Sequence, residues 1–295
     1  MSRFGVWFAE TLNKIIPPQP IHRQLAMDKL STKGYQEREY HEAERVCPEF
    51  GPLWDIAGKR VLDVGSGLGG KPIYYTDLGA RNVTAIDLRA YSTRSALALA
   101  RERQLQAIVH PMLGNATRMP FSNNSFDTIV SINVFEHIDD LPTALAECKR
   151  VLRPGALIFL HFPPFYSPWG PHVENWIDFP WPHLLFSDKT LIQVARRVEE
   201  HRKNNADYIP TAQVDWENLD RLPELNRITV RQFTRLIRAL DLTVVESRLL
   251  PFGWHDLANR GPLARGALTI LRVLSTLPLL REVITTKMVF VRTKA

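Results

Sequence analysis

A tight cluster of glycines directly after a short apolar run constrains the fold of this chain most. Residues 60–64 (RVLDV) lead into GSGLGG at 65–70, and an apolar segment with such an end is typical of a buried parallel strand. Glycines at this turn let the backbone approach a ligand closely and turn its amide groups toward it. The next helix is expected to begin near Gly70, with Pro72 in its first turn and Gly79 just beyond its end.

Strand and helix patterns alternate from this turn to about residue 160. Ser92 and Asp140 are the expected N-caps of two of the helices. This alternation predicts an α/β fold, a doubly wound Rossmann-like sheet with right-handed crossovers and ligands at the carboxyl ends of its strands. The further strands are predicted over residues 82–87, 107–113, 126–132 and 156–160.

The alternation breaks after Leu160 and resumes at Thr229, which forms a capping-box pattern with Gln232 before two last strands at 242–250 and 283–292. A long insertion in a compact domain is usually functional, so the segment at about 161–227 is predicted to be a substrate cap. A second insertion over 253–280 is predicted to hold another helix. We therefore expect a helical N-terminal segment over 1–55 and one domain over 56–295.

The N-terminal segment has an aromatic and apolar pattern at helical spacing from Phe4 to Ile16, followed by a PPQP break at 17–20. Packing of this helix on the main domain is expected, and a membrane-surface anchor remains the alternative. The chain lacks the pattern of a signal peptide and any apolar run of the roughly 18 residues that a membrane span needs. A cytoplasmic protein is the expectation, for which membrane contact is allowed but not required.

Charge and cysteine content argue against some classes of partner. The net charge of +6 permits an acidic partner, but the Lys and Arg residues are dispersed along the chain, which disfavours nucleic acid. The two cysteines, Cys47 and Cys148, lack the spacing of metal ligands. Neither a metal site nor a disulfide framework is expected, and a reducing compartment fits.

Two carboxylates accompany the glycine run. The spacing G-x-G-x-G at 65–69 differs from the G-x-G-x-x-G of dinucleotide enzymes, which disfavours a nicotinamide dehydrogenase. Asp63 lies inside the strand, two residues before the first glycine. Asp87 ends the second strand, where a carboxylate can accept both hydroxyls of a ribose; a carboxylate that only caps a helix is the alternative.

The run from Asp63 to Gly70 resembles motif I of the class I S-adenosylmethionine (SAM)-dependent methyltransferases, and within them the small-molecule enzymes of the type 11 kind. The resemblance covers roughly residues 55–160 and the closing strand–helix–strand pattern. It implies a seven-stranded sheet with an antiparallel last strand, and SAM as the cofactor. The other matching stretches follow in the family's order: 114–121 (GNATRMPF), 125–130 (SFDTIV), 133–138 (NVFEHI) and 150–155 (RVLRPG).

The resemblance implies roles for single residues in cofactor binding. Gly65, Ser66 and Gly67 would line the methionine and ribose parts of SAM, with Asp63 near the methionine amino group. Asp87 would bind the ribose hydroxyls.

The adenine side of the site is implied in the same way. Leu88 would touch adenine, and Asn115 stands where the family usually has an Asp that contacts the adenine amino group. An Asn accepts that hydrogen bond through its carbonyl oxygen. The backbones of Ala116 and Asn133 would complete the pocket.

Methyl transfer needs positioning and exclusion of water, and a hydroxyl acceptor also gains from a general base. His137 and His161, at the tips of the fourth and fifth strands, are the candidate bases. A structural turn is the alternative for His137. Aromatic residues and two further histidines, His172 and His183, crowd the cap, which fits either its own small core or an apolar acceptor pocket.

The acceptor is expected to be a small molecule that is methylated on a hydroxyl. The Pro163-Pro164 pair does not match the motif of amino-directed nucleic-acid methyltransferases, because it follows the fifth strand and not the fourth. An RNA or protein methyltransferase and a SAM-binding module without catalysis remain the alternatives. The sequence leaves the oligomeric state and the pathway open.

Overall fold

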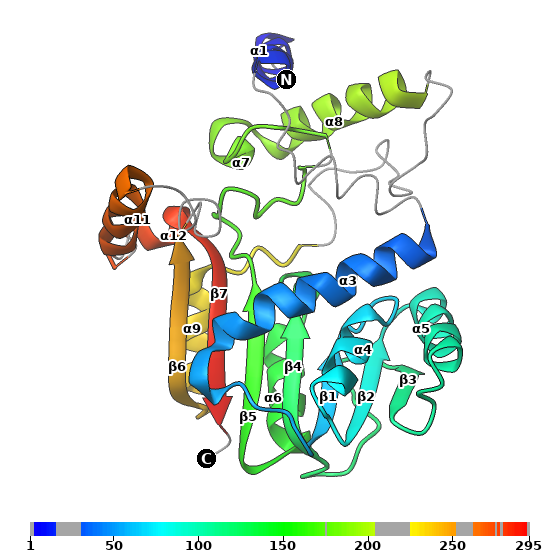
Figure 1. Cartoon of the computed structure of the whole chain (residues 1–295). Coiled ribbons are helices and arrows are strands. Elements are labelled where there is room, and N and C mark those ends of the chain that lie inside the picture. The colour runs from blue at the N-terminus through cyan, green and yellow to red at the C-terminus, as the bar shows by residue number, and fades with distance from the viewer. Residues whose placement is uncertain are drawn as a thin grey trace. The chain divides into compact units, whose positions relative to one another are not determined.

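The computed structural model of the chain describes residues 3–15, 31–174, 176–203, 225–251, 262–274, 276–277 and 280–293. The chain divides into two compact units (Figure 1). The helical unit consists of Met1–Ser31, Pro163–Thr229 and Pro251–Thr286, and the sheet unit consists of Thr32–Phe162, Val230–Leu250 and Lys287–Ala295. Residues 1–55 are thus shared between the two units.

The sheet unit is built on a seven-stranded sheet in the order β3-β2-β1-β4-β5-β7-β6. The first five strands pair in parallel, and β7 runs antiparallel to β5. The predicted α/β class with a central parallel sheet is confirmed. The strands are β1 (Arg60–Val64), β2 (Asn82–Asp87), β3 (Val109–Leu113), β4 (Phe126–Ile132), β5 (Leu152–Phe162), β6 (Thr243–Pro251) and β7 (Thr285–Thr293).

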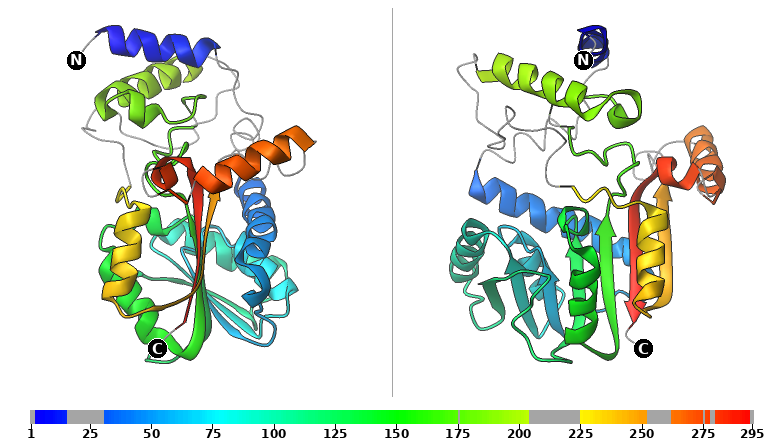
Figure 2. Two further views of the ribbon diagram at one scale, coloured as in Figure 1. Left: turned by 90° about the vertical axis from the view of Figure 1, so that its left-hand side faces the viewer. Right: turned by 180° about the vertical axis from the view of Figure 1, so that it is seen from behind.

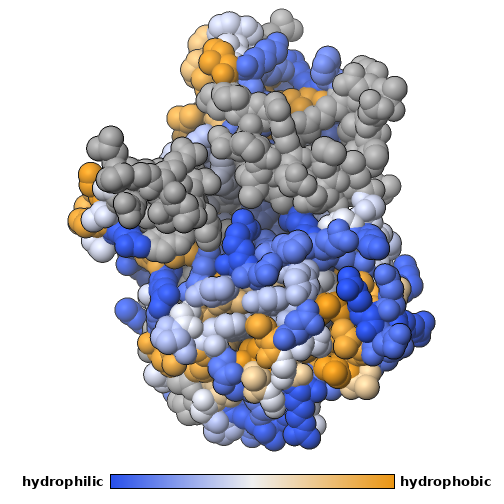
Figure 3. Space-filling view, in the orientation of Figure 1, coloured by the Kyte–Doolittle hydropathy of each residue, from blue (hydrophilic) through white to orange (hydrophobic). Residues whose placement is uncertain are grey.

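Helices cover both faces of this sheet: α6 and α9 lie on one face, and α3 and α4 lie on the other (Figure 2). Hydrophilic side chains line the outer side of α3 (Figure 3). Its buried residues recur at helical spacing, and two of them, Gln36 and Glu39, are polar. The helices of the unit are α3 (Thr32–Val46), η1 (Cys47–Leu53), α4 (Gly70–Asp77), α5 (Ala90–Glu102), η2 (Phe135–His137), α6 (Leu141–Val151) and α9 (Val230–Ala239).

One of the two predicted N-caps is found in the structure. The Asp140 side chain accepts a hydrogen bond from Thr143 N at 3.1 Å, so this cap of α6 is confirmed. The cap predicted at Ser92 is wrong, because α5 already begins at Ala90. The helix thus begins two residues before the predicted cap. It follows a turn in which the Asp87 carboxylate accepts a hydrogen bond from Arg89 N.

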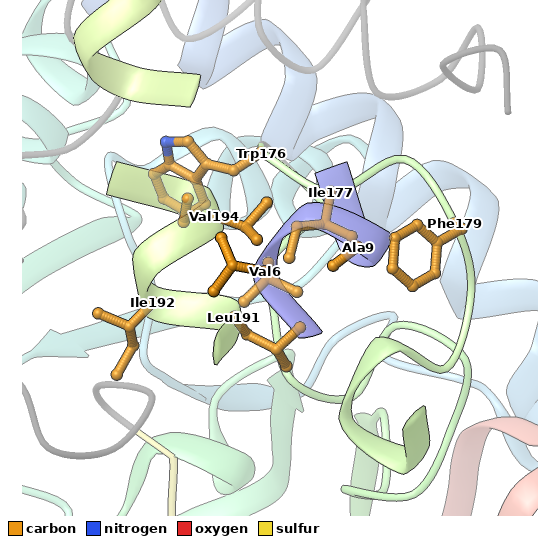
Figure 4. Close-up of a cluster of buried hydrophobic side chains, with 10 residues drawn as sticks. Val6, Ala9, Trp176, Ile177, Phe179, Leu191, Ile192 and Val194 are labelled. Carbon is orange, nitrogen blue, oxygen red and sulfur yellow. The ribbon is translucent and has the colours of Figure 1, made fainter. Parts of the chain in front are cut away.

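The helical unit has a core of its own (Figure 4). The inner side of α1 (Arg3–Ile15) contributes Val6 and Ala9, which pack with residues of α8 (Asp188–Lys203). Trp176 and Phe179 are buried in the same cluster, so part of the aromatic density in the predicted cap is core. The unit also contains α7 (Pro182–Leu185), α11 (Pro262–Leu274) and α12 (Leu280–Ile284). The helices α7 and α8 were not predicted, whereas α11 confirms the helix expected in the second insertion.

The outer side of α1 is aromatic and exposed. Phe4 and Trp7 are 67% and 57% exposed, and the rings of Phe4 and Phe8 stack at 6.1 Å. No described helix combines the length and the apolar composition that crossing a bilayer requires. Membrane contact therefore stays a prediction, and the PPQP break at 17–20 lies outside the described residues.

Candidate functional site

The glycine run forms a loop whose backbone only glycine adopts easily. Gly65, Gly67 and Gly69 have φ angles of 74°, 63° and 105°, all in the left-handed region. Gly65 N donates a hydrogen bond to Ile86 O at 2.8 Å, which ties the loop to β2. A Cβ atom on Gly65 would lie 2.3 Å from the Val134 side chain, so Val134 occupies the space that a side chain at position 65 would need.

Asp63 lies below this loop as a buried carboxylate. Its side chain has no exposed surface, and within the described part of the chain neither oxygen accepts a hydrogen bond. Burial raises the pKa of Asp63 from 3.8 to about 7; nearby Lys71 lowers it, and Glu39 and Asp87 raise it further. A buried acceptor without a donor is costly, so the residue fits a bound cationic group.

This raised pKa predicts that binding of a cationic ligand depends on pH. A positive charge beside Asp63 favours its ionised form, so affinity for S-adenosylhomocysteine should increase with pH up to about 7 and then level off. Below about pH 7 the affinity should rise by up to about tenfold per pH unit. Calorimetric titration with S-adenosylhomocysteine at several pH values measures this slope of affinity against pH. The slope should vanish in Asp63→Asn but persist in Asp55→Asn, which alters an exposed carboxylate; a slope that survives in Asp63→Asn excludes this residue as its source.

The same pKa predicts the sign of its effect on folding. Because the pKa of Asp63 is higher in the folded chain than its ordinary 3.8, this group contributes stability that is complete below about pH 4. That contribution is lost as the pH rises through about 7.

Asp87 is held rigidly at the carboxyl end of β2. Its Oδ2 accepts a hydrogen bond from Gly67 N at 3.0 Å, and its Oδ1 accepts one from Arg89 N at 2.9 Å. These contacts place a fixed carboxylate beside the glycine loop, as ribose binding needs. Leu88, the residue expected to touch adenine, is 70% exposed.

The other residues predicted to contact the cofactor lie just after the ends of β3 and β4. The Asn115 Oδ1 accepts hydrogen bonds from both N and Oγ1 of Thr117 at 2.9 Å, and Ala116 is half-buried between them. The contact of Asn115 with adenine, which stays a prediction, would compete with this turn. Asn133 has a φ of 55° and donates a side-chain hydrogen bond to Glu42 Oε1 at 2.7 Å.

Two charged side chains form hydrogen bonds with the backbone of the glycine loop. The sequence analysis did not predict either of them. The Glu39 carboxylate accepts hydrogen bonds from Leu68 N at 2.9 Å and from Gly70 N at 3.0 Å. The Lys71 ammonium donates to Gly65 O at 2.9 Å and to Ile132 O at 3.3 Å. The signal available in the sequence was a polar stripe, Gln36 and Glu39, on the side of α3 that turns inward.

Both side chains are buried, and their charges support each other. Burial lowers the pKa of Lys71, but attraction from Asp63, Glu39 and Glu42 outweighs it, so this pKa is raised and the ammonium stays charged. Burial raises the pKa of Glu39, and the attraction of Lys71 only partly offsets that rise.

The two histidines predicted as bases lie in different surroundings. The His161 side chain is completely buried, and its Nε2 lies 3.0 Å from Glu49 Oε2. The His137 side chain is partly exposed, and its Nε2 lies 3.9 Å from Glu136 Oε1. Since Glu49 belongs to η1, the sheet unit contains a buried histidine–carboxylate pair that the sequence pattern did not suggest.

A second aromatic group of the helical unit surrounds His183. Its ring lies 5.0 Å from that of Phe165 and 6.2 Å from that of Tyr166, centroid to centroid. Burial lowers the pKa of His183 to about 4, so its imidazole is neutral near pH 7. Both ring nitrogens are buried without a hydrogen-bond partner in the described residues.

Comparison with known proteins supports the family resemblance. Residues 62–160 match the model of a family described as a methyltransferase domain. The chain is 35% identical over 100 residues to 24-methylenesterol C-methyltransferase 2 of Arabidopsis thaliana, which is 34% of this chain and 28% of that protein. It is 34% identical over 114 residues to O-methyltransferase resE of Aspergillus sclerotiorum, which is 38% of this chain and 43% of that protein. The matches thus span less than half the length of either relative.

Solved structures agree on the fold. The chain superimposes on a geranyl diphosphate C-methyltransferase from Streptomyces coelicolor A3(2) with a TM-score of 0.54 and 14% identity, covering 86% of this chain and 78% of that one. It also superimposes on the [4+2]-cyclase SpnF with a TM-score of 0.52 and 18% identity, covering 86% and 80%. A shared fold at this identity does not define the reaction. The family model identifies a methyltransferase domain over residues 62–160, and the shared fold and the glycine loop agree with a class I SAM-dependent one.

Proposed function

We propose that the protein transfers the methyl group of SAM to a hydroxyl of a small-molecule acceptor. The observation that carries this proposal is the Asp63 carboxylate, buried beside a loop of left-handed glycines and without a hydrogen-bond donor among the described residues. The Asp87 carboxylate, fixed beside the same loop by Gly67 N, supports it.

The residues present fit the proposed cofactor. When bound, SAM supplies an electrophilic methyl group on a sulfonium sulfur. Asp63 would hold the cationic amino end, and Asp87 would accept hydrogen bonds from the ribose hydroxyls. The rigid loop would orient the bound molecule, and orientation together with exclusion of water supplies most of the acceleration in a displacement of this kind.

The proposed acceptor is small and largely apolar. The names of the relatives include a methyltransferase acting on a sterol and an O-methyltransferase, which are compatible with such an acceptor. In the helical unit, Tyr166 and the neutral His183 combine aromatic surface with hydrogen-bonding capacity, which suits a hydroxyl on an apolar molecule. Screening hydroxyl-bearing metabolites for release of S-adenosylhomocysteine tests the reaction.

Replacing Asp87 by alanine should weaken cofactor binding by about 1–3 kcal/mol, because hydrogen bonds from the ribose to a charged acceptor are lost. This corresponds to a rise of about 5- to 150-fold in the Kd of S-adenosylhomocysteine measured by calorimetry. Asp140→Ala, which removes the cap of α6, is the matched control and should leave that Kd unchanged. Equal affinity of Asp87→Ala and the unaltered chain would refute the ribose assignment.

A module that binds SAM but catalyses no methyl transfer is the rival function. Calorimetry with SAM and S-adenosylhomocysteine separates the cases. Binding of neither compound would overturn the proposal as a whole. Binding of both, with no acceptor that yields S-adenosylhomocysteine in a broad screen, would favour the rival.

A further inference from the structure

Two side chains bind the backbone at the glycine loop, one through a carboxylate and one through an ammonium group. A free amino acid carries the same two charged groups. The two amides of the loop, Leu68 N and Gly70 N, converge on the Glu39 carboxylate. Two carbonyl groups, Gly65 O and Ile132 O, converge on the Lys71 ammonium. Amides that converge on a carboxylate and carbonyls that converge on an ammonium are the groups that recognise an α-amino acid.

The contact with Glu39 is close enough to exclude another group from the same place. A Cβ atom on Gly67 would lie 1.9 Å from Glu39 Oε1, so this carboxylate lies directly against the loop. A ligand carboxylate that approached the same amides would meet Glu39 both sterically and as a like charge. The same holds for a ligand ammonium at the carbonyls that Lys71 contacts.

Burying this pair is costly, which argues against a purely structural role. Charged groups taken out of water lose solvation that their mutual attraction often fails to recover, and apolar residues would fill the space at lower cost. Between them Glu39 and Lys71 hold three backbone groups of the loop and one at the end of β4, Ile132 O. Asp63 is buried below the loop and accepts no hydrogen bond within the described residues. Its carboxylate is therefore available to contact a cationic group of the ligand.

We propose that Glu39 and Lys71 are exchangeable occupants of the amino-acid end of the cofactor site and determine its selectivity for that end. A ligand with a free amino-acid end displaces them and takes over the four backbone groups. A nucleoside without that end binds and leaves them in place. The proposal rests on the proposed SAM function, and it concerns only how the two side chains modify that binding.

Two ligands and three variants test this inference. S-Adenosylhomocysteine and 5′-methylthioadenosine share the adenosine part and the thioether sulfur, but only the first has the amino-acid end. Their Kd values are measured by calorimetry for the unaltered chain, Lys71→Met, and the charge-balanced double variant Glu39→Gln/Lys71→Met. The control double variant, Asp55→Asn/Lys59→Met, removes an exposed ion pair near the start of β1.

The double variant should bind S-adenosylhomocysteine about tenfold more tightly, since the ligand no longer displaces two charge-assisted contacts. Its affinity for 5′-methylthioadenosine should stay within about twofold, and the control should change neither value. Thermal unfolding of each variant confirms that it is folded. Lys71→Met alone should shift the ratio of the two affinities in the same direction.

Other outcomes overturn the inference without touching the proposed function. Weaker binding of S-adenosylhomocysteine to folded Lys71→Met would mean that Lys71 contacts the ligand directly. An unchanged ratio in the folded double variant would mean that the pair only supports the loop. Failure of the unaltered chain to bind either compound would instead refute the proposed function.

Discussion

Replacing His161 by alanine is expected to reduce the turnover number of methyl transfer on the order of 10²–10⁴-fold, as loss of a general base does. The affinity for S-adenosylhomocysteine should stay unchanged, because the cofactor contacts proposed above involve the glycine loop, Asp63 and Asp87. Glu49 lies 3.0 Å from His161 Nε2 and would orient the imidazole, so Glu49→Gln should cause a smaller loss. Single-turnover kinetics with an acceptor from the metabolite screen, together with calorimetry, measures both quantities.

The burial of His161 makes a structural role the competing explanation. The pair with Glu49 is buried, and removing one partner of such a pair destabilises a fold by about 3–5 kcal/mol. A structural role predicts a large drop in melting temperature for His161→Ala together with weaker cofactor binding. His110→Ala, which removes an exposed histidine of β3 in the same sheet, is the matched control. A near-normal rate in folded His161→Ala would exclude the general base.

The strands and the cofactor loop could be predicted because their signals are local. Short apolar runs give β1, β2 and β4 at the residues predicted, and the left-handed glycines follow from the glycine run after β1. Asp63 and Asp87 lie where strand ends converge in a parallel sheet, so their proximity to the loop follows from fold class alone. The geometry of the proposed cofactor site was therefore accessible from the sequence.

What the sequence did not reveal depends on contacts between distant segments. Glu39 lies 29 residues before Leu68 in the chain, and its place in a polar stripe with Gln36 does not reveal which segment it contacts. Lys71 follows the glycines directly, yet its burial arises from β4, whose Ile132 O accepts its hydrogen bond. The pairing of His161 with Glu49 likewise joins β5 to η1.

Replacing Gly70 by valine is expected to lower the free energy of unfolding of the sheet unit by about 3 kcal/mol or more, the upper range for an overpacked site. At Gly70, α4 lies directly against α3: a Cβ atom there would lie 2.0 Å from Gln36 O and 2.8 Å from Tyr40 N. Both are backbone atoms of a helix, so no side-chain rotation relieves the contact and α3 itself must move. Denaturant unfolding followed by circular dichroism measures the loss.

The intrinsic preference of the helix works against this loss and is too small to cancel it. Valine is a better helix former than glycine by about 0.5 kcal/mol, well below the cost of moving a packed helix. Gly266 in α11 separates the two effects, since a Cβ atom there has no neighbour within 4 Å in the described part of the chain. Gly266→Val should therefore change the free energy of unfolding by no more than about 0.5 kcal/mol. Movement of α3 would also withdraw Glu39 from Leu68 N and Gly70 N, so Gly70→Val should loosen the glycine loop. A loss in Gly70→Val no larger than that in Gly266→Val would show that the close approach of α3 does not govern the site.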